Sequence, residues 1–124
     1  MKNLLDLSRE QELAIAAMNL ISLEEHLAFT EMKTEKQEYL ELLEAVRSIR
    51  RNAMENLVKN REGEAWCISK HLLAATMRLT ETAAKYLDEP ETAKKLYAAA
   101  QQTWILFWVV QKIGNENGKA KKKV

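Results

Sequence analysis

Apolar residues recur every three or four positions along most of the chain, the spacing of one face of an α-helix. The pattern predicts four helices, over about residues 8–32, 34–60, 64–87 and 90–113. Capping-box sequences that begin at Ser8 and Thr34 are typical of helix starts, and they open the first two segments. Gly63 precedes the third segment, and Pro90 stands in the first turn of the fourth, where its missing N–H is tolerated. The pattern therefore predicts an all-α protein.

The connections between these segments are short, which favours an antiparallel, up-down-up-down four-helix bundle formed by one domain over residues 1–113. One long helix over residues 8–60 is the alternative, because this stretch lacks glycine and proline. The capping box at Thr34 favours a turn near Lys33 instead. We expect Gly114 to end the fourth helix and the lysine-rich segment 114–124 to be a disordered tail.

The first and fourth segments are more apolar than a solitary bundle needs. The first carries two apolar stripes, and residues 104–110 are apolar around the whole helix. Soluble monomers avoid large exposed apolar patches, so the sequence predicts a homo-oligomer, with a symmetric dimer favoured. The expected interface consists of Leu20, Leu27, Trp104, Phe107 and Trp108.

Composition excludes several other classes of protein. Three glycines and one proline in 124 residues are too few for the frequent turns of a β-sandwich, a barrel or a doubly wound sheet. A single cysteine rules out an internal disulfide framework and fits a reducing compartment, so we expect a cytoplasmic protein. The longest apolar run has seven residues (104–110), whereas a membrane span needs about 20, so no membrane partner is expected.

Glu25 lies inside the second apolar stripe of the first segment. An ionised carboxylate in such a place must be paired or must coordinate a cation. In a hairpin that turns near Lys33, Arg47 of the second segment is just within reach. We therefore expect a buried Glu25–Arg47 ion pair, with an exposed Glu25 and a metal-ligand role as the alternatives.

Glu64, Cys67 and His71 share one face of the third segment, and together with Glu25 they form a weak candidate set of metal ligands. The paired Glu-x-x-His motifs of di-iron bundles do not occur, so neither a metal nor another cofactor is expected. Cys67, which has Lys70 and His71 as neighbours, is the candidate for a nucleophile. Because the sequence offers no partner to orient His71 and no glycine-rich loop, we expect no catalytic activity.

Positive charge gathers in the second half of the second segment and in the tail. These cations could contact phosphates without sequence specificity, although they also complement the dipole of the second helix. The candidate contacts are Arg47, Arg50, Arg51, Arg61, Lys119, Lys121, Lys122 and Lys123. The sequence thus predicts a non-enzymatic protein that acts by self-association and by binding another protein or a nucleic acid. Accessory nucleic-acid binding and metal binding are the alternatives.

Overall fold

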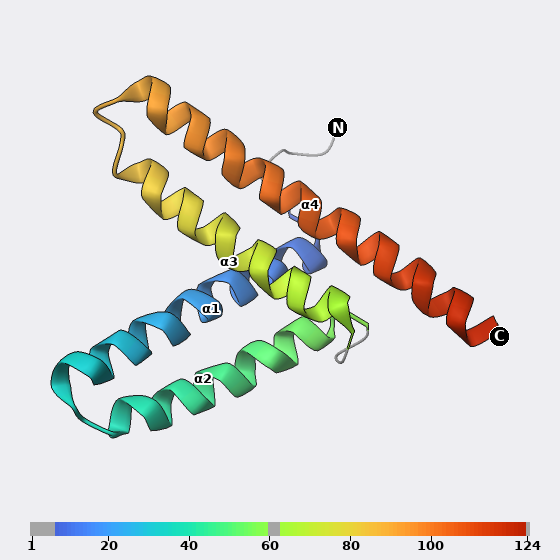
Figure 1. The fold of residues 1–124 in the computed structure, drawn as a ribbon, viewed down its shortest axis with the longest axis horizontal. Coiled ribbons are helices and arrows are strands. Elements are labelled where there is room, and N and C mark those ends of the chain that lie inside the picture. Colours follow the sequence, from blue (N-terminus) through green and yellow to red (C-terminus); the bar gives the residue numbers. More distant parts are fainter. Residues whose placement is uncertain (1–6, 60–62, 124) are drawn as a thin grey trace. The chain divides into compact units, whose positions relative to one another are not determined.

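A computed structural model shows an all-helical chain, described for residues 7–59 and 63–123, with side chains as far as residue 114 (Figure 1). Its elements are α1 (Arg9–Thr34), α2 (Glu38–Glu55), α3 (Glu64–Ala84) and α4 (Pro90–Lys123). The described ranges contain no strand, so the all-α prediction is confirmed. Helices α1 and α2 pack as one helical hairpin, and α3 and α4 pack as a second. The single up-down-up-down bundle stays a prediction.

The predicted capping box at the start of α1 is present. The Ser8 hydroxyl accepts a hydrogen bond from the backbone N–H of Gln11 at 3.1 Å. In return, the side-chain oxygen of Gln11 accepts one from the backbone N–H of Ser8 at 2.8 Å. Two backbone donors that the helix leaves unpaired at its first turn are satisfied in this way.

The second predicted capping box, at Thr34, is wrong. Thr34 is the last residue of α1, where its hydroxyl donates to the Thr30 carbonyl at 2.9 Å instead of opening α2. Glu35 adopts a left-handed conformation (φ 59°) and donates its N–H to the Glu31 carbonyl at 2.7 Å, which ends the helix. This part of the chain therefore forms two helices, as predicted, and the turn between them lies at residues 35–37, two to four residues after Lys33.

Two helices end earlier than predicted. Helix α2 stops at Glu55, where the next two backbone N–H groups bond to carbonyls three residues back. Helix α3 stops at Ala84, and Lys85 and Tyr86 make the same tighter bonds. A last turn of this kind is common at helix ends, and apolar periodicity does not detect it.

Helix α4 ends later than predicted, because its backbone stays helical past Gly114 to Lys123. The predicted helix end at residue 113 is therefore wrong, whereas the predicted disorder of the lysine-rich segment 114–124 stays a prediction. Gly114 does not adopt the positive φ of a C-terminal cap. A Cβ atom at Gly114 would lie 3.2 Å from the Cβ atom of Ala65, so the glycine allows α4 to approach α3 closely.

The α3–α4 hairpin has a core of apolar side chains crossed by two polar links. Phe107 is fully buried, as is Leu73. The side-chain amide of Gln111 donates to the buried Ser69 hydroxyl at 2.7 Å. The hydroxyl oxygens of Thr76 and Thr103 also lie 2.7 Å apart. Residue numbers rise along α3 and fall along α4 from one link to the other, as antiparallel packing requires. Within the described part of the chain, no helix is both long and apolar enough to cross a bilayer.

Candidate interaction surfaces

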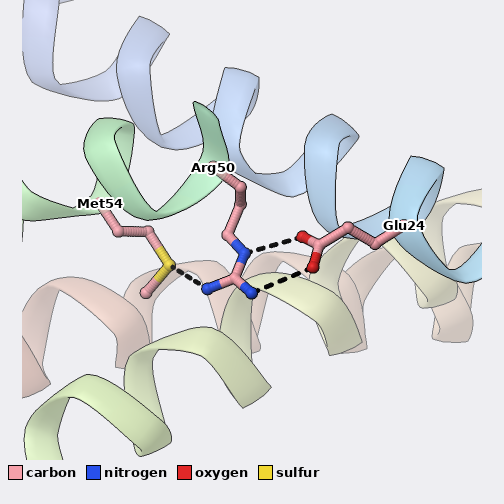
Figure 2. A network of polar contacts seen from close by, with 3 residues as sticks. All are labelled: Glu24, Arg50 and Met54. Carbon is pink, nitrogen blue, oxygen red and sulfur yellow. Dashed lines mark hydrogen bonds and ion pairs between the residues drawn. The ribbon is translucent and has the colours of Figure 1, made fainter. Parts of the chain in front are cut away.

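A buried ion pair joins the two helices of the first hairpin (Figure 2). Arg50 Nε lies 2.8 Å from Glu24 Oε2, and Arg50 Nη2 lies 3.1 Å from Glu24 Oε1, which makes the contact bidentate. The third guanidinium nitrogen, Nη1, lies 3.7 Å from the sulfur of Met54. The Arg50 side chain is 2% exposed and that of Glu24 is 14% exposed. Because Arg50 is buried and forms a bidentate ion pair, it stabilises the hairpin and is not accessible to a ligand.

The predicted buried pair of Glu25 and Arg47 is wrong, because both residues are exposed. The physical reason is the position of the turn. Gln37 stands midway in sequence between Glu24 and Arg50, so a turn over residues 35–37 brings those two side chains level. Glu24 also lies four residues after Leu20, on the stripe that faces α2.

Among the candidate nucleic-acid contacts whose side chains the structure describes, only Arg47 is exposed. Of this set, Arg47 is exposed, Arg50 is buried against Glu24, and Arg51 is half-buried with an Nε atom that has no hydrogen-bond partner. Arg61 lies outside the described residues, as do the side chains of Lys119, Lys121, Lys122 and Lys123.

The weak candidate ligands are exposed on two helices, Glu25 on α1 and Glu64, Cys67 and His71 on α3. The described residues contain no group of three or more histidine, cysteine, aspartate or glutamate side chains that could hold a metal ion. The shared helical face of the three α3 residues thus does not bring them together as a ligand set. No cofactor is assigned.

The predicted oligomer interface divides into core and partly covered residues. Phe107 is wrong as an interface residue, because it is fully buried inside the α3–α4 hairpin. Trp104 stacks on it at 6.3 Å between ring centroids, and Trp108 meets it edge-on at 4.8 Å. Both tryptophans are half-buried, as are Leu20 and Leu27 of α1. The aromatic cluster of Trp104, Phe107 and Trp108 is therefore centred on a buried residue and is not a fully exposed surface.

Among the described side chains of α4, four large aliphatic ones are each between 45% and 52% exposed. They are Ile105, Leu106, Val109 and Ile113, which we call the α4 outer face. At about 100° per residue these positions share one side of the helix, turned away from the side of Phe107 and Gln111 that meets α3. Residues 104–110 are all apolar in the sequence, so the sequence pattern does not indicate which side of this segment faces outward.

A mostly apolar pocket of about 220 Å³ adjoins the α4 outer face. Ile113 belongs to both, and Ile68 on α3 adds a second exposed aliphatic side chain. The remaining lining residues are Glu64, Ala65, Val110 and Gly114. The apolar surface of this hairpin therefore extends from the middle of α4 onto the first turns of α3.

A separate apolar surface flanks the turn of the first hairpin. Phe29 and Met32 lie at the end of α1 and Leu40 at the start of α2, and all three are exposed, Met32 by 70%. We call these three residues the hairpin tip. Glu35 and Glu38, also exposed, lie between them in sequence.

Comparison of the chain with protein families, with characterised proteins and with solved structures finds no match in any of the three. No relative's activity or partner can therefore be carried over to this chain. Its function has to be argued from its own surfaces, among which the α4 outer face and the hairpin tip expose large apolar side chains.

Proposed function

We propose that this chain is a non-enzymatic helical protein that acts through self-association and the binding of another macromolecule, and that the α4 outer face is its contact surface. The observation that supports the proposal is the row of four half-exposed aliphatic side chains on one side of α4. Exposed apolar side chains are common when they stand alone, whereas a contiguous row on one helix face is typical of an interface.

The size of this face sets the expected strength of association. Complete burial of one such side chain is worth roughly 1.5–3 kcal/mol, so burial of the exposed half contributes about 1 kcal/mol. Burial of four such side chains of one copy against a similar apolar area of a second copy then contributes about 8 kcal/mol. Association itself costs about 4–15 kcal/mol, so the outer face alone gives a weak complex. Adjoining groups such as Ile68 and Trp108 are therefore needed for a stable homo-oligomer, of which a dimer is the smallest.

The test is the mass of the untagged protein in solution, measured by size-exclusion chromatography with light scattering over a range of concentrations at low salt. We expect a mass greater than that of one chain. The double variant Ile105→Gln/Val109→Gln removes two side chains from the centre of the outer face and should run as a single chain with an unchanged helical circular dichroism spectrum. Absorbance at 260 nm in the same run tests for bound nucleic acid.

Leu87→Gln is the matched control. Leu87 is 64% exposed but lies between α3 and α4, outside the outer face, so this variant should keep the mass of the unmodified protein. An unmodified protein that remains a single chain at all concentrations would contradict the proposal. So would an Ile105→Gln/Val109→Gln variant whose mass does not change.

A further inference from the structure

Two regions of the chain carry net charges of opposite sign, although the net charge of the whole chain is only +1. Residues 25–44, which include the hairpin tip, contain six glutamates and two lysines. Residues 105–123, which include the α4 outer face, contain five lysines and one glutamate. The hairpin tip therefore lies in a region of net negative charge, and the α4 outer face lies in a region of net positive charge.

Pairing of two α4 helices through the same face is electrostatically unfavourable. An antiparallel pair centred on Val109 places Lys95 of each copy close to the lysines at positions 119–123 of the other. A parallel pair places the two lysine-rich ends side by side. Juxtaposed like charges oppose association in both arrangements.

Pairing of the α4 outer face with a hairpin tip has the opposite property. Aliphatic side chains of α4 would cover Phe29, Met32 and Leu40, while Lys112 and the lysine-rich end of the helix would lie among glutamates. An amphipathic helix that binds an apolar surface with flanking charges of opposite sign is a common mode of protein recognition. We propose that the α4 outer face of one copy binds the hairpin tip of a second copy, an inference that rests on the proposed self-association.

Such a contact is heterologous, because it joins two different surfaces. Each bound copy still presents one free outer face and one free tip, so further copies can add to form a closed ring or an open filament. The mass should therefore rise beyond two chains with concentration. It should fall with added salt, because exposed charge pairs are screened over about 10 Å at 0.1 M salt.

Mixing two single-surface variants tests the proposal directly. The tip variant Phe29→Gln/Met32→Gln keeps an intact outer face, and the face variant Ile105→Gln/Val109→Gln keeps an intact tip. Each variant alone should run as a single chain, because its intact surface finds no complement. We expect the loss of two half-exposed apolar side chains to raise the dissociation constant by about 30-fold. An equimolar mixture should form a complex of two chains that cannot grow.

The measurements are light scattering and sedimentation velocity of each variant and of the mixture, at low and at high salt, with circular dichroism to verify helix content. A tip variant that assembles as well as the unmodified protein would overturn this inference and leave the proposed self-association intact. A mixture that stays at the mass of one chain would also overturn it. An unmodified protein that is itself a single chain would instead refute the proposed function. Leu87→Gln again serves as the control, and it should assemble to the same mass as the unmodified protein.

Discussion

Because Glu24 and Arg50 form an ion pair with unequal exposure, we expect removal of either side chain to destabilise the fold, by different amounts. Arg50 is 2% exposed and Glu24 is 14% exposed, so the arginine has less access to water when its partner is removed. Glu24→Leu strands a buried guanidinium, and we expect it to lower the free energy of unfolding by about 3 kcal/mol. Arg50→Met strands a carboxylate that still reaches solvent, and we expect a cost of about 2 kcal/mol.

The double variant Glu24→Leu/Arg50→Met supplies the magnitude of the coupling. Replacement of a whole buried ion pair by apolar side chains of similar size is often neutral, so the double variant should lie within about 1 kcal/mol of the unmodified protein. Independent sites would instead give the sum of the single costs, about 5 kcal/mol. The expected coupling free energy is therefore about 4–6 kcal/mol.

The assay is urea-induced unfolding followed by circular dichroism at 222 nm, at a protein concentration at which the chain is not assembled. Arg47→Met is the matched control, because Arg47 is exposed on the same helix and its replacement should change the free energy of unfolding by less than about 0.5 kcal/mol. Single costs that add in the double variant would refute the reasoning. An Arg50→Met variant as stable as the Arg47→Met control would refute it as well.

Three further substitutions test other contacts. Gln111→Leu removes the donor to the buried Ser69 hydroxyl and should cost about 1–2 kcal/mol by tryptophan fluorescence, with Ser69→Ala in the same chain recovering most of the loss. Ser8→Ala removes the capping box of α1 and should cost about 1 kcal/mol by circular dichroism. Gly114→Ala crowds the Cβ atom of Ala65 and should cost roughly 1 kcal/mol despite a better helix propensity. The same change should become stabilising in an Ala65→Gly background.

The four helices could be predicted from the sequence because their apolar periodicity is local. The start of α1 was predictable for the same reason, since a capping box needs only Ser8 and Gln11 in helical spacing. The same sequence pattern at Thr34 was misleading. A threonine hydroxyl near a helix end can also donate to the carbonyl four residues back, and the sequence alone does not decide between the two hydrogen bonds.

The predicted position of this turn also explains why the predicted ion pair was wrong. A turn over residues 35–37 moves every cross-hairpin pairing along α2, so the residue level with Glu24 is Arg50 in the second half of α2 and not a residue of its first half. Arg50 and not Arg47 forms the ion pair because Arg50 lies level with Glu24 across the hairpin. Glu24 and not Glu25 is its partner because Glu24 lies on the side of α1 that faces α2. A pairing prediction between helices thus depends on a loop conformation, here the left-handed Glu35, that propensity does not encode.

The rotation of α4 explains why the apolar surplus is found on the surface. An apolar run from Trp104 to Val110 can face its neighbour in any orientation at a similar gain in burial. The polar residues that flank the run remove this freedom. Thr103 and Gln111 each lie about one turn from Phe107 on the same side of α4, where they reach Thr76 and Ser69 of α3 respectively. Any other rotation would separate these hydroxyl and amide groups from their partners and leave some of them buried and unpaired, at about 1–3 kcal/mol each. Buried polar groups therefore fix which side of α4 faces α3, and the aliphatic side chains on the opposite side remain exposed as the surface that self-association would bury.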